Sequence, residues 1–182
     1  MKVSEWFSTD ILIIGGGLSG MAAAWAAGSE KKITVLLDGA GASPYIHGFS
    51  LPVGEGDSPE LLFQDTRESG RFQGKESLAK HLAFQSLEVP RLLQQLDLPL
   101  DRNPDGSLAL LRPLGASVPR VAASGNHTGA VIRAKLRKRL IARGNTSFLT
   151  GFRALRLVHG PAGAGGALVF DRRRNRFLYF TA

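Results

Sequence analysis

A short continuous apolar run at residues 11–14 and a mainly apolar segment at 32–37 lie on either side of a segment rich in alanine at 18–27. Apolar runs of this length, without polar alternation, are typical of strands buried on both faces. The small residues between them predict a helix that packs closely on its neighbours, and Gly28 is placed to end it. The pattern predicts a strand–helix–strand unit that begins a parallel sheet.

The middle of the chain has mainly helical periodicity. Ser58 and Pro59 are suited to the N-cap and first position of a helix that ends near residue 68. A longer helical pattern follows at 76–96, and Pro90 is expected to divide it. Further elements expected are a strand at 108–111 and a basic helix that has Thr128 as its N-cap and is closed by Gly144.

The last third of the chain predicts strands at 147–150, 154–158, 166–170 and 176–181. The first reads as a third strand of the parallel sheet, and the other three as an antiparallel meander. The expected fold class is therefore α/β: one Rossmann-like domain over 1–182 with a central parallel sheet. It would carry a helical and loop insertion at about 58–127 and the meander at about 153–181.

The junction between the first strand and helix carries a specific chemistry. Gly15 allows a tight turn, Gly17 lets a pyrophosphate approach the backbone, and Gly20 allows the helix to pack closely on the strand. The free N–H groups of the helix start then face the phosphates. Asp38, 23 positions after Gly15, is placed to accept hydrogen bonds from ribose hydroxyls. The alternative is a glycine-rich turn that holds no ligand.

Composition narrows the classes further. The chain has no cysteine, which excludes disulfides and thiolate chemistry and suits a reducing compartment, so a cytoplasmic location is expected. The apolar stretch at 11–27 is interrupted by glycines and is no membrane span. Of the net charge of +8, residues 128–182 carry twelve basic and one acidic side chain. This pattern is typical of a solvated basic helix face, and nucleic-acid binding is not expected.

Several blocks resemble the FAD-dependent oxidoreductases of the fumarate reductase, succinate dehydrogenase and L-aspartate oxidase family. The resemblance rests on the glycine block with Asp38, on Ser43, and on residues 57–66, 115–120 and 126–129. It implies FAD as cofactor. The residues that it assigns to FAD are Gly15, Gly17, Leu18, Ser19, Gly20, Asp38, Gly39, Ser43 and Ala154.

The sequence departs from the family pattern in three places. Ala116 stands where the family has a histidine, although Ser117 and Arg120 are kept, and Asn126 replaces an aspartate. Family members also continue with a returning strand, a substrate-capping domain and a further flavin-binding segment. The sequence is therefore expected to be incomplete: a fragment, a truncated gene product, or one piece of a split protein whose partner chain supplies the rest.

Arg120 is the candidate catalytic residue, as a cation facing the substrate or flavin; the alternative is a structural salt bridge. His47 is interpreted as a loop histidine near the cofactor, because Pro44 occupies the family's covalent-attachment position. His127 is either a general base or a helix-start residue with a structural hydrogen bond. The histidines share no metal-ligand spacing, so no metal site is predicted.

The leading functional hypothesis is the FAD-binding part of a flavin oxidoreductase that acts on a small anionic molecule. One alternative is a non-catalytic nucleotide-binding module that keeps the ADP site alone. A second alternative is an NAD-linked dehydrogenase domain.

Overall fold

The computed structural model describes residues 3–160 and 163–182. The chain divides into two compact units. The first consists of the described residues up to Pro44 together with Arg133–Ala182, and the second is Tyr45–Ile132. The first unit is therefore built from two separate stretches of sequence, and the second from one.

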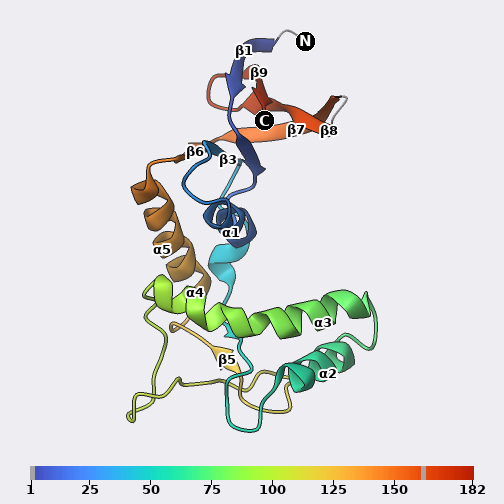
Figure 1. The fold of residues 1–182 in the computed structure, drawn as a ribbon, viewed down its shortest axis with the longest axis vertical. Coiled ribbons are helices and arrows are strands. Elements are labelled where there is room, and N and C mark those ends of the chain that lie inside the picture. Colours follow the sequence, from blue (N-terminus) through green and yellow to red (C-terminus); the bar gives the residue numbers. More distant parts are fainter. Residues whose placement is uncertain (1–2, 161–162) are drawn as a thin grey trace. The chain divides into compact units, whose positions relative to one another are not determined.

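A parallel three-stranded sheet organises the first unit, in the order β2-β3-β6 (Figure 1). Strand β2 (Ile11–Ile14) pairs with β3 (Ile33–Leu37), which pairs on its other edge with β6 (Thr146–Thr150). Every residue of β3 is buried, including the polar Thr34, as expected for a mainly apolar strand in the middle of a parallel sheet. Helix α1 (Leu18–Ala26) connects β2 to β3, and the positive φ of Gly28 ends it as predicted.

The second sheet of this unit has the order β1-β9-β8-β7. Strands β7 (Phe152–Gly160), β8 (Gly163–Asp171) and β9 (Arg176–Thr181) form the predicted antiparallel meander, of which residues 161–162 lie outside the described residues. Strand β1 (Val3–Ser8) was not expected and adds to β9 in parallel. A shared core joins the two sheets: Leu36, Ala167, Val169, Leu178 and Phe180.

The second unit is mainly helical. Helices α2 (Pro59–Ser69) and α3 (Glu76–Gln85) lead through the short 3₁₀ turn η2 (Ser86–Glu88) to α4 (Val89–Gln95). Strands β4 (Phe49–Ser50) and β5 (Val121–Ala122) form a minimal antiparallel pair. A second 3₁₀ turn, η1 (Ser43–Tyr45), lies at the boundary with the first unit.

Helix α5 (Thr128–Arg143) starts in the second unit and ends in the first. The predicted closing glycine, Gly144, has a φ of +83°. Thr128 does not act as the expected N-cap, because its hydroxyl donates to the carbonyl of His47 and accepts from the N–H of Ser124. The hydroxyl is thus engaged by the preceding loop and not by the first turn of the helix.

Two other local predictions need correction. The expected strand at 108–111 forms only isolated bridges, Arg102 with Leu108 and Leu111 with Val121, because no neighbouring strand is long enough to pair with it. The long helical pattern does divide, but at η2, so that Pro90 lies in the first turn of α4, where its missing N–H costs nothing. The N-cap prediction for Ser58 is confirmed: its hydroxyl accepts from the N–H of Leu61 at 3.1 Å.

Candidate functional site

The glycine turn between β2 and α1 has the geometry that its residues predict. Gly15 has a φ of +103°, which side-chain-bearing residues rarely adopt, and its N–H donates to the carbonyl of Leu36 at 2.9 Å. A Cβ on Gly20 would overlap the carbonyl oxygen of Gly15. Glycine at position 20 is therefore required for the close approach of helix to turn.

Ser43 lies at the N-terminus of α1, although it is 25 positions away from Leu18 in sequence. Its Oγ accepts a hydrogen bond from the N–H of Leu18 at 2.9 Å. A Cβ on Gly17 would lie 3.0 Å from the same oxygen. The first free N–H groups of α1, the turn and the Ser43 hydroxyl thus converge on one point, which is suited to a phosphate.

Asp38 directly follows β3 and forms ion pairs with two arginines. Its Oδ2 accepts from Nε of Arg153 at 2.7 Å, and its Oδ1 accepts from Nη1 of Arg172 at 3.1 Å. These hydrogen bonds, first from Arg153 and then from Arg172, lower the pKa of the Asp38 carboxyl. The carboxylate stays ionised and 35% exposed, and each oxygen has a lone pair left for a ribose hydroxyl.

The remaining predicted cofactor residues lie at the N-terminus of α1, beside Asp38, or on β7. Leu18 and Ser19 are in the first turn of α1, with Ser19 exposed. Gly39 is exposed directly after Asp38. Ala154 is on β7, where it pairs with Val169. All the predicted FAD residues belong to the first unit.

Arg120 is in the second unit and is 1% exposed. Its Nη2 lies 3.0 Å from Oδ1 of Asp57 and 2.9 Å from Oδ2 of Asp65. Ser117 donates to Asp65 from its hydroxyl and from its backbone N–H. Burial raises the pKa of Asp65, but the two Ser117 hydrogen bonds and the Arg120 charge outweigh it and lower that pKa. This burial and pairing favour the structural alternative for Arg120.

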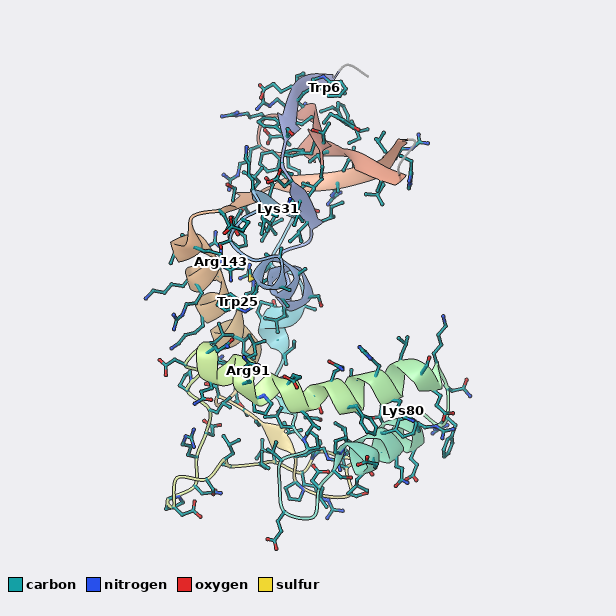
Figure 2. The ribbon with its side chains drawn as sticks, viewed as in Figure 1. Trp6, Trp25, Lys31, Lys80, Arg91 and Arg143 are labelled. Carbon is teal, nitrogen blue, oxygen red and sulfur yellow. The ribbon has the colours of Figure 1, made fainter. Side chains whose placement is uncertain are left out.

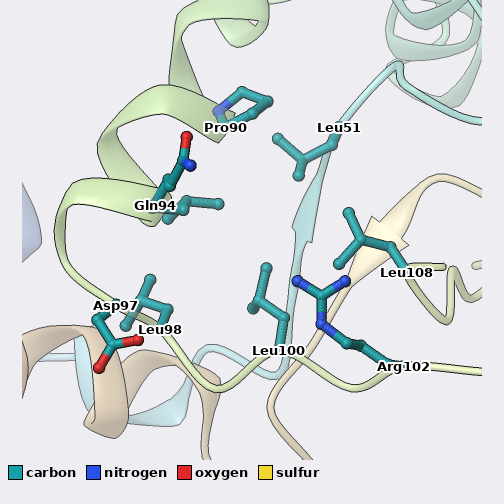
Figure 3. A pocket seen from close by; sticks show the side chains of 9 residues that line it. Leu51, Pro90, Gln94, Asp97, Leu98, Leu100, Arg102 and Leu108 are labelled. Carbon is teal, nitrogen blue, oxygen red and sulfur yellow. The ribbon is translucent and has the colours of Figure 1, made fainter. Parts of the chain in front are cut away.

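Besides a smaller pocket at α2 and α3, two pockets open in the second unit. One, of about 260 Å³, is lined in part by Asp65, Arg120 and Ala116, the residue that replaces the family histidine. The other, of about 380 Å³, is lined mainly by leucines, with Gln94, Asp97 and Arg102 as its polar side chains (Figure 3). The aliphatic lining of the second pocket is suited to bind an apolar group. Sequence reasoning had predicted neither.

Three arginines near the predicted FAD residues were also missed. Arg153 and Arg172 pair with Asp38, and Nε of Arg133 lies 3.5 Å from the carbonyl oxygen of Gly16. In the sequence Arg133 is one basic residue among several on a helix. One signal in the sequence could have indicated such a residue. Residues 11–29 contain no cation, so any positive side chain at the glycine turn has to come from another segment.

His47, His81, His127 and His159 are all exposed. Within residues 3–160 and 163–182, no three histidine, aspartate or glutamate side chains are grouped to hold a metal ion. In the same residues, no helix has the length and apolar character needed to cross a membrane.

Comparison with known proteins identifies the class to which this arrangement belongs. The model of an FAD-binding domain family matches residues 10–182. The chain therefore belongs to this family, and it corresponds to the N-terminal part of the FAD-binding domain of fumarate reductases, succinate dehydrogenases and L-aspartate oxidases.

The similar proteins include an oxidase and a subunit of a dehydrogenase. The chain is 29% identical to the L-aspartate oxidase of Clostridium acetobutylicum over 154 residues, which are 82% of this chain and 35% of the relative. It is 29% identical over 129 residues to the succinate dehydrogenase flavoprotein subunit of Bacillus subtilis, covering 66% of this chain and 22% of the relative.

Among solved structures, the Mycobacterium smegmatis Sdh1 complex in the apo form has the same fold. It matches with a TM-score of 0.89 and 21% identity over 98% of this chain and 34% of that one. The chain thus spans about a third or less of the length of these relatives. The mixed α/β fold with a parallel sheet and an antiparallel meander is confirmed.

Proposed function

We propose that this chain is the FAD-binding portion of a flavin-dependent oxidoreductase that acts on a small anionic substrate. The observation that carries the proposal is the convergence, in the first unit, of the glycine turn, the N-terminus of α1 and the Ser43 hydroxyl, with Asp38 at the end of the adjacent strand. The family match over residues 10–182 supports it.

The residues present fit the cofactor. Because Gly17 and Gly20 have no side chain, a diphosphate can approach the backbone of the turn. The N–H groups at the start of α1 can then donate to its oxygens. Asp38 is ionised and partly exposed, as an acceptor for the adenosine ribose hydroxyls must be. Gly39 and Ala154 continue this end of the site, and Ser43 serves the phosphates. When bound, FAD supplies hydride or two-electron chemistry, and this chain supplies its binding and orientation.

The substrate class is proposed from the named relatives. L-aspartate oxidase and succinate dehydrogenase are both named for small dicarboxylates. The groups that bind substrate are not assigned to residues of this chain. A cytoplasmic location is proposed on composition alone, and cell fractionation tests it.

Visible spectroscopy of the purified 182-residue chain, mixed with FAD and dialysed, tests cofactor binding. Stoichiometric bound flavin that anaerobic addition of aspartate or succinate bleaches supports the whole proposal. Bound flavin that neither compound reduces supports the FAD site alone and overturns activity of this chain.

The alternatives predict different ligands. A non-catalytic nucleotide module would bind ADP and leave the protein colourless after dialysis against FAD. An NAD-linked dehydrogenase domain would bind NADH in preference to FAD. Isothermal titration with ADP, FAD and NADH separates the three functions.

A further inference from the structure

We propose that Arg133 binds the diphosphate of the cofactor as a cation supplied to the glycine turn by α5. In the first unit α5 contacts both ends of the α1 segment: Nε of Arg133 lies 3.5 Å from the carbonyl oxygen of Gly16, and Nη1 of Arg143 lies 3.1 Å from the carbonyl oxygen of Gly28. The contact holds the guanidinium at the turn where the phosphates are expected.

The segment that forms the glycine turn contains no cation. Residues 11–29, which include β2, the turn and α1, contain no charged side chain. The α1 dipole contributes the equivalent of roughly half a positive charge, whereas a diphosphate carries negative charge on both phosphates. An arginine that reaches the turn from another helix supplies the charge that the turn lacks.

The guanidinium has donors to spare. Arginine carries five N–H donors, and the contact with Gly16 uses the single one on Nε. The four N–H groups on Nη1 and Nη2 remain for phosphate oxygens, which guanidinium groups bind with paired hydrogen bonds. No ion pair joins Arg133 to a carboxylate in the described part of the chain.

The residue differs from the fully exposed basic residues of the same helix. Arg133 is partly buried, as Lys135 and Arg143 are, whereas Arg137, Lys138 and Arg139 are exposed. Arg133 contacts the carbonyl of Gly16 at the turn, and the exposed residues form the solvated face that the sequence predicts. Arg133 is therefore separated from that face by position and by contact.

This inference rests on the proposed FAD site, so its test begins with unsubstituted protein. The 182-residue chain and its Arg133→Gln, Arg133→Lys and Arg139→Gln variants are titrated with FAD, ADP and adenosine. Arg139→Gln removes the same charge from an exposed position of the same helix. Circular dichroism and thermal melting confirm that each variant is folded.

Arg133→Gln should weaken FAD and ADP by about tenfold, the loss expected for one hydrogen bond to a charged group. Adenosine, which has no phosphate, should bind as before. Arg133→Lys keeps the charge but loses the paired donors, so its affinity should lie between those of Arg133→Gln and the unsubstituted chain. Arg139→Gln should match the unsubstituted chain. The salt dependence of ADP binding should also become shallower in Arg133→Gln.

Two failures are distinguishable. If the unsubstituted chain binds neither FAD nor ADP, the proposed function is wrong, and the role of Arg133 with it. If the unsubstituted chain binds ADP, and Arg133→Gln binds it with the same affinity and salt dependence as Arg139→Gln, the FAD site stands and the role of Arg133 is overturned.

Discussion

Replacing Arg120 with leucine tests whether this buried arginine stabilises the second unit. Its side chain is 1% exposed and lies within 3.0 Å of carboxylate oxygens of both Asp57 and Asp65. Leucine removes the cation that pairs with both carboxylates. Removing one partner of a buried ion pair costs about 3–5 kcal/mol, because it leaves uncompensated buried charge. We expect the free energy of unfolding to fall by that amount.

Urea unfolding monitored by circular dichroism measures this loss near neutral pH. Arg91→Leu is the matched control, because Arg91 is an exposed arginine of α4 in the same unit (Figure 2). The control should change the unfolding free energy by less than about 0.5 kcal/mol, as surface substitutions usually do.

Acid provides a second, independent readout of the same cluster. The folded pKa of Asp65 is lowered below 3.8, so the stability that it contributes is present above 3.8 and is lost as pH falls through the folded pKa. In Arg120→Leu the carboxyl loses its cation, its folded pKa rises, and the cost of the substitution should shrink as acid protonates it.

The reasoning is refuted if Arg120→Leu unfolds at the same urea concentration as Arg91→Leu. A variant of unchanged stability that no longer turns over substrate in the FAD-loaded protein would instead support the catalytic interpretation of Arg120. The Asp65→Asn variant separates the two further, since the structural account predicts that it lowers stability and leaves cofactor affinity unchanged.

Three more predictions concern the first unit. Gly20→Ala should lower the free energy of unfolding by about 1–3 kcal/mol in urea titration, because its Cβ would overlap the carbonyl of Gly15; equal stability would contradict this packing. Asp38→Asn should weaken ADP binding about tenfold in calorimetry, through loss of a charged acceptor; unchanged affinity would remove Asp38 from the site. Arg143→Ala should lower the free energy of unfolding by about 1–2 kcal/mol, measured by thermal melting. Nη1 of Arg143 contacts the carbonyls of Ala24, Trp25 and Gly28, and the guanidinium lies 4.5 Å from the Trp25 ring centroid (Figure 2). An unchanged melting temperature would show that these contacts contribute nothing.

Local signals made the start of the fold predictable. Mainly apolar segments without alternation identified β2 and β3. Gly15, Gly20 and Gly28 marked the turn and the helix end, because a positive φ or a close backbone approach at each position requires glycine. Ser58 was predictable for the same reason, since an N-cap depends on a few neighbouring residues.

Elements that depend on distant partners were not predictable. Strand β1 has polar and charged residues in its short sequence, and it is a strand because β9, more than 170 positions away, pairs with it. The segment at 108–111 shows the reverse: it has the pattern of a strand, but in the described residues it forms only single bridges, to Arg102 and to Val121. Tertiary pairing decides both cases.

The candidate site divides in the same way. The glycines, Asp38 and Ser43 follow from motif and spacing, but their charged partners do not. Arg153 and Arg172 are 115 and 134 positions from Asp38, and Arg133 is 117 positions from Gly16. Neither periodicity nor composition connects residues at such separations.

The division of the first unit between two stretches of sequence has a consequence for folding during synthesis. Strands β2 and β3 emerge early, but β6 starts at Thr146, and β9, the partner of β1, extends to Thr181. The free edges of β3 and β1 therefore stay unpaired until these later strands have been made. Tyr45–Ile132, which is continuous, can become compact first. During that interval the apolar β2–β3 pair is the segment most exposed to aggregation, and the ribosome-bound chain is where chaperones are most needed.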